Sequence, residues 1–192
     1  MTTETPILTI EELKHAYGRV TVLEDVSFDV RLGEVTAIVG PNGSGKTTLI
    51  RAIVGLHRPT GGAVHYRGPD AVRPIGYLQQ RPTFRSGQTV REAISFYASL
   101  VGETGADALE RIERVGLEAA ADRNVEALSG GMTRLLGIAQ ATVGDPPLVV
   151  LDEPASGLDP NMSANVFETA AEMTDAGTTV LLSSHDLALV EE

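Results

Sequence analysis

The sequence predicts an α/β fold built on a mixed sheet core, with an antiparallel β subdomain and an inserted α-helical subdomain. Three changes of pattern along the 192 residues predict this fold. Residues 7–80 carry strand-like patterns, residues 81–146 carry helical patterns, and residues 147–192 return to strand and helix. Because 192 residues suggest one domain, we expect residues 1–192 to form a single unit that contains residues 81–146 as an insertion.

The N-terminal part contains three candidate strands. ILTIEEL (7–13) and VTVLEDVSFDV (20–30) alternate apolar and polar residues, which is the period of half-buried strands. VTAIVG (35–40) is a short continuous apolar run, which is typical of a buried strand in a parallel sheet.

The middle part has helical periodicity. One predicted helix face contains Val90, Ile94, Tyr97 and Val101, and a second contains Met132, Leu135, Leu136, Ala139 and Val143. GDPP (144–147) is a natural joint back to the sheet. It is followed by the apolar strand PLVVLD (147–152), a helix near 162–175 and the strand TTVLLSS (178–184).

Composition excludes several classes of protein. No run approaches the roughly 18 apolar residues needed to span a bilayer. Residues 1–6 have neither a basic flank nor an apolar segment, so we expect no secretory signal. Cysteine is absent, which excludes disulfides and thiolate metal sites and fits a reducing compartment.

The charge is strongly acidic. There are 26 acidic and 15 basic residues, for a net charge of −11, and only Lys14 and Lys46 are lysines. A surface rich in carboxylates and poor in lysine resembles that of halophilic proteins; the alternative is an ordinary acidic soluble protein. In either case, the acidity argues against a large nucleic-acid interface, which needs a basic face.

GPNGSGKTT (40–48) is the strongest local signal. It lies between a predicted strand and a predicted helix, which is the context that a phosphate-binding loop requires. Gly40, Gly43 and Gly45 let the backbone fold tightly, so that its N–H groups point at phosphate oxygens. Lys46 would reach the β- and γ-phosphates, and Thr47 would offer its hydroxyl to Mg²⁺.

A second motif, PLVVLDEP (147–154), is an apolar strand that ends in two acids. Acids at the C-terminal end of a parallel strand lie beside the phosphate loop. Asp152 can hold Mg²⁺, directly or through water, and Glu153 can orient and polarise the attacking water.

A third motif, LSGGM (128–132), predicts another anion site. Ser129 can cap the following helix, while Gly130 and Gly131 leave its N-terminus uncovered. Because the chain already has a phosphate loop, this motif raises the question of which phosphate it serves.

In their order along the chain, the motifs resemble those of the nucleotide-binding subunits of ABC transporters, and the resemblance covers nearly the whole chain. GPNGSGKTT resembles the Walker A motif, LVVLDEP the Walker B motif and LSGGM the signature motif. SGLDP resembles the D-loop, SSHD the H-switch and GYLQQ the Q-loop. HAYG places Tyr17 where the family stacks an aromatic ring on adenine.

The resemblance implies a P-loop NTPase fold of the ABC-ATPase type and Mg²⁺-dependent hydrolysis of ATP to ADP and phosphate. It implies catalytic roles for Glu153, His185 and Gln80, and metal-binding roles for Thr47, Gln80 and Asp152. The implied nucleotide-binding residues are Tyr17, Gly40, Pro41, Asn42, Gly43, Ser44, Gly45, Lys46, Thr47, Thr48, Ser129, Gly130, Gly131 and Asp159.

The resemblance also implies partners. In the family, ATP lies between the Walker A loop of one subunit and the signature motif of a second, so LSGGM would bind the phosphate of the partner's nucleotide. We therefore expect a homodimer or similar pair that works with a separate transmembrane subunit, on which the helical subdomain rests. This places the chain in the cytoplasm, peripheral to the cytoplasmic face of the cell membrane, with no nucleic-acid partner.

The chain departs from the family pattern at two places. Met132 stands where the family more often has Gln, but the serine hydroxyl and the backbone N–H groups remain, so we expect activity to survive. The chain stops at DLALVEE, within a helix-like stretch, so we expect a truncated C-terminal end and an unpaired edge of the sheet.

Some alternatives stay open. Gln80 is assigned to the Q-loop by its place after YL, and Gln79 is the competing assignment. A soluble ABC ATPase acting on nucleic acid or ribosomes is the alternative function, and a nucleotide-dependent binding module without catalysis is another. The short helical insert and LSGGMTR resemble exporter-type subunits, including those of the copper-related system that matures nitrous oxide reductase.

Overall fold

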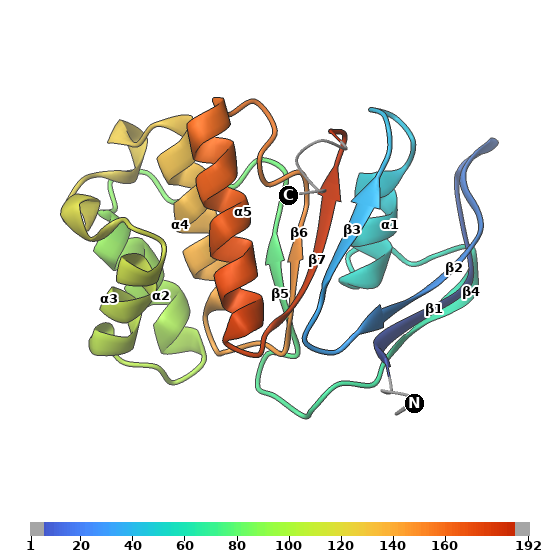
Figure 1. Cartoon of the computed structure of the whole chain (residues 1–192), viewed down its shortest axis with the longest axis horizontal. Helices are drawn as coiled ribbons and strands as arrows, with labels where there is room; N and C mark the ends of the chain where they lie inside the picture. Colours follow the sequence, from blue (N-terminus) through green and yellow to red (C-terminus); the bar gives the residue numbers. More distant parts are fainter. Residues whose placement is uncertain (1–5, 187–192) are drawn as a thin grey trace.

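The computed structural model describes residues 6–186 and has two sheets and three groups of helices (Figure 1). An antiparallel sheet of order β2-β1-β4 consists of β1 (Pro6–Tyr17), β2 (Val20–Arg31) and β4 (Gly61–Tyr66). A parallel sheet of order β3-β7-β6-β5 consists of β3 (Val35–Val39), β5 (Ile75–Leu78), β6 (Leu148–Leu151) and β7 (Thr179–Ser184). Among the named strands within residues 6–186, antiparallel pairs occur in the first sheet and parallel pairs in the second.

The two faces of the parallel sheet pack against different layers. On β6, Leu148 and Val150 belong to a core shared with helix α1 (Lys46–Ile53) and the antiparallel sheet. Val149 and Leu151 point the other way, into a core shared with α4 (Gly130–Thr142) and α5 (Pro160–Asp175). The short continuous apolar run of this strand is explained by its burial on both faces.

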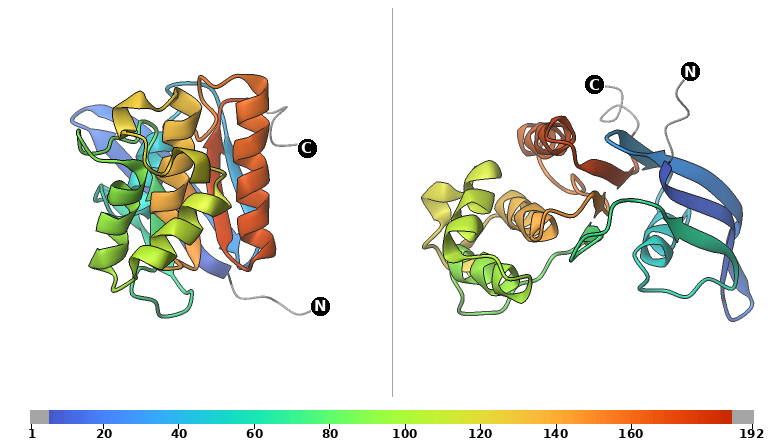
Figure 2. Two further views of the ribbon diagram at one scale, coloured as in Figure 1. Left: turned by 90° about the vertical axis from the view of Figure 1, so that its left-hand side faces the viewer. Right: turned by 90° about the horizontal axis from the view of Figure 1, so that it is seen from below.

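The predicted insertion is helical, as expected. It contains α2 (Val90–Leu100), α3 (Gly105–Arg114), two short 3₁₀ turns (Glu118–Ala120 and Val125–Ala127) and α4. In Figure 2, α2 and α3 lie on the far side of α4 from the parallel sheet. Thr89 and Thr104 begin α2 and α3 with capping boxes that pair them with Glu92 and Asp107.

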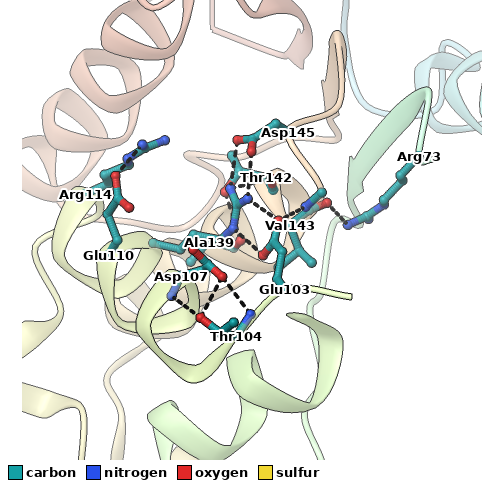
Figure 3. Close-up of polar contacts among 12 residues, drawn as sticks. Arg73, Glu103, Thr104, Asp107, Glu110, Arg114, Ala139, Thr142, Val143 and Asp145 are labelled. Carbon is teal, nitrogen blue, oxygen red and sulfur yellow. Dashed lines mark hydrogen bonds and ion pairs between the residues drawn. The ribbon is translucent and has the colours of Figure 1, made fainter. Parts of the chain in front are cut away.

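Two arginines make polar contacts at the C-terminal end of α4 (Figure 3 draws their partners). Arg111 of α3 donates to the carbonyl of Thr142 at the end of α4 (2.7 Å), to the Asp145 carboxylate (3.2 Å) and to both oxygens of Glu103. Arg73, just before β5, donates to the carbonyls of Gln140 (2.9 Å) and Val143 (3.2 Å). Two arginines therefore donate to carbonyls at and just beyond the C-terminal end of α4.

The helix predicted near 162–175 begins slightly earlier, at Pro160, because Asp159 caps it and proline is well suited to the first helical position. Within residues 6–186, none of the helices combines the length and the apolar character needed to cross a membrane. Nearly all of the predicted helix-like stretch DLALVEE lies outside the described residues.

Candidate nucleotide-binding site

The candidate site lies where the parallel strands end. β3 runs into the loop 40–45, which leads into α1, while residues 152–153 follow β6 and His185 follows β7. The backbone N–H of Gly40 donates to the carbonyl of Ser184 (3.2 Å), which holds the start of the loop against the end of β7. The parallel topology thus gathers three motifs that are far apart in the sequence.

The loop conformation depends on Gly45. This residue precedes the first residue of α1 and has φ 95°, a left-handed conformation that favours glycine. A Cβ at this position would also lie 3.1 Å from the carbonyl oxygen of Val22 and from the side chain of Leu23. A side chain here would be strained in its backbone and crowded by β2.

Lys46 is the first residue of α1, and its ammonium group is buried inside the loop. Its Nζ donates to the carbonyl oxygens of Gly40 (2.5 Å) and Pro41 (3.1 Å) and lies 3.0 Å from Oε1 of Glu153. The side chain is only 7% exposed, and that of Glu153 only 5%. A buried cation is therefore already positioned at the place where the loop can receive an anion.

Asp152 carries the oxygens that suit a metal ion. Thr47 Oγ1 donates to Asp152 Oδ1 (3.2 Å), and Ser183 Oγ donates to the same oxygen (2.9 Å). Oδ2 is buried and has no hydrogen-bond partner within the described residues. Burial raises the pKa of Asp152, and the hydrogen bonds from Ser183 and Thr47 partly offset that effect. An unpartnered carboxylate oxygen beside a threonine hydroxyl fits the oxygen ligands that Mg²⁺ prefers.

Glu153 is held by contacts on both oxygens. Oε1 contacts Lys46, and Oε2 lies 2.6 Å from Nδ1 of His185. Its backbone N–H donates to Ser183 Oγ (2.9 Å), and its φ is 50°, an uncommon conformation for a residue other than glycine. Burial would raise the pKa of this carboxyl, but the hydrogen bonds from His185 and Lys46 outweigh burial and lower it. Glu153 is therefore an ionised carboxylate in a fixed orientation.

A cavity of about 400 Å³ lies over these groups. It is lined by Val22, Asn42, Gly43, Gly45, Lys46, Thr47, Thr48, Gln80, Glu153 and Ser156. Gln80 thus lies at this cavity, whereas Gln79 lines a different one beside Arg73 and Tyr77. This placement favours Gln80 over Gln79 as the Q-loop residue.

The signature residues lie apart from this cavity. Ser129 caps α4 by accepting a hydrogen bond from the N–H of Met132 (3.2 Å), as the sequence predicts. A Cβ on Gly131 would lie 2.6 Å from the Met162 side chain of α5, whereas a Cβ on Gly130 would meet nothing within 4 Å. None of residues 129–131 is among the described residues that line the cavity, so α4 presents its N-terminus elsewhere.

Two further residues that the sequence assigns to the nucleotide have other contacts in this structure. Asp159 accepts a hydrogen bond from the N–H of Met162 (3.1 Å) and caps α5. Tyr17, at the end of β1, is 48% exposed, and its hydroxyl lies 3.0 Å from Nδ1 of His57.

Sequence reasoning missed two residues beside the acids. Ser183 holds both Asp152 and the backbone of Glu153; it is the first residue of SSHD, but the sequence analysis gives it no role. Arg134 of α4 donates to the carbonyl of Ser156 (3.4 Å), and its Nη1 is buried without a partner within the described residues. Arg134 ends the LSGGMTR stretch, but the sequence analysis gives it no role.

Comparison with known proteins identifies the family. A sequence profile described as ABC transporter matches residues 23–156. The chain belongs to the ABC transporter family. It is 35% identical to Nod factor export ATP-binding protein I of Ralstonia nicotianae, over 94% of this chain and 60% of that protein. It is 38% identical to the uncharacterized ABC transporter ATP-binding protein YdbJ of Bacillus subtilis, over 97% of this chain and 64% of that protein.

Solved structures of the ABC transporter family share the fold. Clostridium perfringens cbiO1, part of the transporter complex cbiONQ, superposes with a TM-score of 0.84 at 29% identity, covering 97% of this chain and 81% of that one. A nucleotide-free ATP-binding cassette superposes with a TM-score of 0.83 at 28% identity, covering 97% and 84%. The P-loop fold of the ABC-ATPase type is thereby confirmed. The chain spans about 60–65% of the length of the first three curated relatives.

Proposed function

We propose that the chain is the ATP-binding and ATP-hydrolysing subunit of an ABC transporter and powers a separate membrane-spanning subunit. The observation that carries this proposal is the buried contact of Lys46 with Glu153, beside the Thr47–Asp152 pair, at one cavity. Phosphoryl transfer to water requires a cation in a glycine-rich loop, a carboxylate that binds the metal and a carboxylate that orients the attacking water.

The loop binds the triphosphate. Residues 40–48 offer backbone N–H groups, and Lys46 offers its ammonium to the β- and γ-phosphates. Two loop carbonyls and Glu153 hold this ammonium inside the loop, so a bound triphosphate would compete with Glu153 for it.

The metal site consists of Thr47, Gln80 and Asp152. Thr47 and Asp152 already share a hydrogen bond, and Gln80 lines the same cavity. A bound Mg²⁺ supplies charge neutralisation at the β- and γ-phosphate oxygens. The protein's part is to hold the oxygen of Thr47 on α1, of Gln80 after β5 and of Asp152 after β6 for the metal.

Glu153 accepts the proton of the attacking water. Its lowered pKa keeps it ionised, and Ser183 and the strained backbone fix its direction. His185 holds the second carboxylate oxygen, and in this proposal it also contacts the γ-phosphate. The water loses its proton to Glu153 as its oxygen bonds to the γ-phosphorus and the bond to the ADP oxygen breaks.

The remaining assigned residues bind the rest of the nucleotide. Tyr17 stacks on adenine from the exposed end of β1. Ser129, Gly130 and Gly131, at the N-terminus of α4, meet the γ-phosphate of the nucleotide on a second subunit, and Asp159 lies at that interface. The LSGGM motif therefore serves another chain's ATP, and ATP binding closes the dimer while hydrolysis opens it.

In this proposal the membrane-spanning subunit, and not this chain, determines which substrate is transported. Relatives are named for Nod factor export in Ralstonia nicotianae and for lantibiotic transport in Streptococcus pyogenes. Exporter-type function and peripheral placement on the cytoplasmic face of the membrane are part of the same proposal.

Crosslinking tests the composite site. Because the chain has no cysteine, Gly130→Cys and Ser44→Cys can be made singly, both carrying Glu153→Gln to retain ATP. Gly130 is preferred over Ser129 because a Cβ at Gly130 is unobstructed and the Ser129 cap is kept. With ATP and a short bis-maleimide, the mixture should form a covalent dimer, and each variant alone should form far less.

Omitting ATP provides the control for this crosslink, and it should remove the dimer. A chain carrying both cysteines that links only within itself would show that the signature motif acts on its own subunit's nucleotide, and the composite site would be rejected.

A further inference from the structure

Three aromatic rings meet beside the end of β1. The ring centroids of His15 and Tyr17 are 4.7 Å apart, and those of Tyr17 and His57 are 6.0 Å apart. The two imidazoles are nearly parallel, with an angle of 24° between them, and the phenol ring is nearly perpendicular to both. His15 is buried and His57 is half-buried, whereas Tyr17 is about half exposed. The two histidines thus form a support against which the exposed ring rests.

His57 is the member that fixes the direction of the phenol. Its Nδ1 lies 3.0 Å from the Tyr17 hydroxyl. Its backbone N–H donates to the carbonyl of Arg51 (3.0 Å), near the C-terminal end of α1. The phosphate loop and Lys46 lie at the other end of this eight-residue helix. Tyr17 is therefore tied, through His57, to the same helix that carries the phosphate site.

The β1–β2 pairing provides a second link. Tyr17 pairs with Val20, and Val22, two residues further along β2, lines the nucleotide cavity. The exposed ring of Tyr17 thus lies at the tip of a hairpin whose next residues border the phosphate loop. A hairpin tip alone leaves an exposed side chain free to change rotamer, and the contact with His57 removes that freedom.

We propose that His57 is a positioning residue for the nucleotide base. By holding the Tyr17 hydroxyl, His57 fixes the distance and orientation of the Tyr17 ring relative to the phosphate loop. Because the ring is already ordered, binding of the base costs no side-chain conformational entropy at Tyr17. This inference rests on the proposed function, in which Tyr17 stacks on adenine. It predicts that His57 contributes to the affinity for the nucleotide base and does not change the affinity for the phosphates.

Binding experiments separate the two contributions. Calorimetry on the Glu153→Gln background gives the Kd for ATP and, as a ligand without a base, for inorganic tripolyphosphate. His57→Ala should weaken ATP binding by about three- to tenfold, the range of one net hydrogen bond, and leave the tripolyphosphate Kd unchanged. With Glu153 restored, KM for ATP should rise while kcat stays the same.

Tyr17→Phe removes the hydroxyl and keeps the ring, so it should reproduce the effect of His57→Ala. The double variant should be no weaker than either single variant, because both remove the same contact. His57→Asn places an amide oxygen near the position of Nδ1 and should restore most of the affinity. His65→Ala is the matched control, since His65 lies on β4 and pairs with Glu11.

The outcomes are distinct. Suppose first that Tyr17→Ala weakens ATP binding, so that the adenine platform stands. The role of His57 is then overturned if the effects of His57→Ala and Tyr17→Phe on the ATP Kd are additive. It is also overturned if His57→Ala weakens the binding of ATP and of tripolyphosphate equally. If Tyr17→Ala itself leaves the ATP Kd unchanged, the adenine platform fails, and the role of His57 fails with it. Thermal melts confirm that each variant is folded before it is compared.

Discussion

Lys46 and Glu153 form a buried ion pair across the candidate site, with Nζ and Oε1 3.0 Å apart. The pair joins the phosphate loop to the end of β6, and each partner has a further contact: two loop carbonyls for Lys46 and His185 for Glu153. In this arrangement Lys46, the proposed phosphate ligand, is neutralised by Glu153, the proposed base for the attacking water. A nucleotide must therefore compete with Glu153 for Lys46 when it binds.

Lys46→Ala should abolish tight MgATP binding, because the triphosphate would then lie in the loop without its buried cation. Calorimetry should show at least about a 100-fold rise in Kd, the size of a lost buried charge-assisted contact. Lys14→Ala is the matched control, because Lys14 is the chain's other lysine and makes an exposed pair with Asp25. Near-native affinity of Lys46→Ala for ATP would refute the assignment of Lys46.

Glu153→Gln should separate binding from chemistry. Hydrolysis should slow by roughly 100-fold or more, in line with the loss of a general base. ATP affinity should be equal or higher, because Lys46 no longer has to leave a carboxylate. Phosphate release gives the rate, calorimetry the affinity, and size exclusion with ATP should show a dimer. Turnover within about threefold of wild type would mean that another group takes the proton.

The sequence predicted most of the fold because the relevant patterns are local. The apolar strand before Asp152, the loop before Lys46 and the Ser129 cap all follow from neighbouring residues, and the structure has each of them. The sheet core and the antiparallel β subdomain were predicted, and the structure has both within residues 6–186. The order of the strands within each sheet was not predicted, because strand periodicity does not specify a strand's neighbours.

Long-range polar contacts were the part that the sequence could not predict. Ser183 holds Asp152, and His57 holds Tyr17 from 40 residues away. Neither contact has a periodicity or a fixed spacing, because each arises where two strands or loops happen to meet in the fold. The cap that Asp159 provides for α5 is instead a local contact, with the N–H of Met162 three residues further on.

The N-terminal cap of α3 predicts a dependence of stability on pH. Hydrogen bonds from the backbone N–H of Thr104 (2.6 Å) and then from its hydroxyl (2.7 Å) lower the pKa of Asp107. Because the folded-state pKa lies below the unfolded value, Asp107 stabilises the fold above the unfolded pKa, and this contribution is lost as pH falls through the folded pKa.

Asp107→Asn tests this sign. The difference in free energy of unfolding between wild type and variant should be largest near about pH 6 and should narrow toward about pH 3. Urea denaturation at the two pH values measures it. A difference that grows as the pH falls would contradict the role given to the cap.

The acidic composition predicts a dependence of stability on salt. With a net charge of −11 and two lysines, the folded chain repels itself, and added salt should relieve that repulsion. If the surface is of the halophilic kind, the melting temperature should continue to rise between about 0.1 M and 2 M KCl, well beyond the range in which screening saturates. A melting temperature that levels off below about 0.5 M KCl would indicate an ordinary acidic protein instead.

Arg111 should matter more to stability than any surface ion pair. Its side chain is 5% exposed and serves Glu103, Asp145 and the carbonyl of Thr142, so it joins α3 to the end of α4 (Figure 3). Arg111→Met should cost about 3 kcal/mol or more in urea denaturation, because Glu103 would keep a largely buried charge without its partner.

Two further variants show whether this cost comes from the stranded charge. Arg114→Met removes the exposed pair with Glu110 and should cost less than about 1 kcal/mol. Adding Glu103→Gln to Arg111→Met should recover part of the loss, because the amide still accepts the hydrogen bond from the backbone N–H of Gly144 (2.7 Å) and carries no charge. If Arg111→Met and Arg114→Met cost the same, the buried network does not hold α3 to the end of α4.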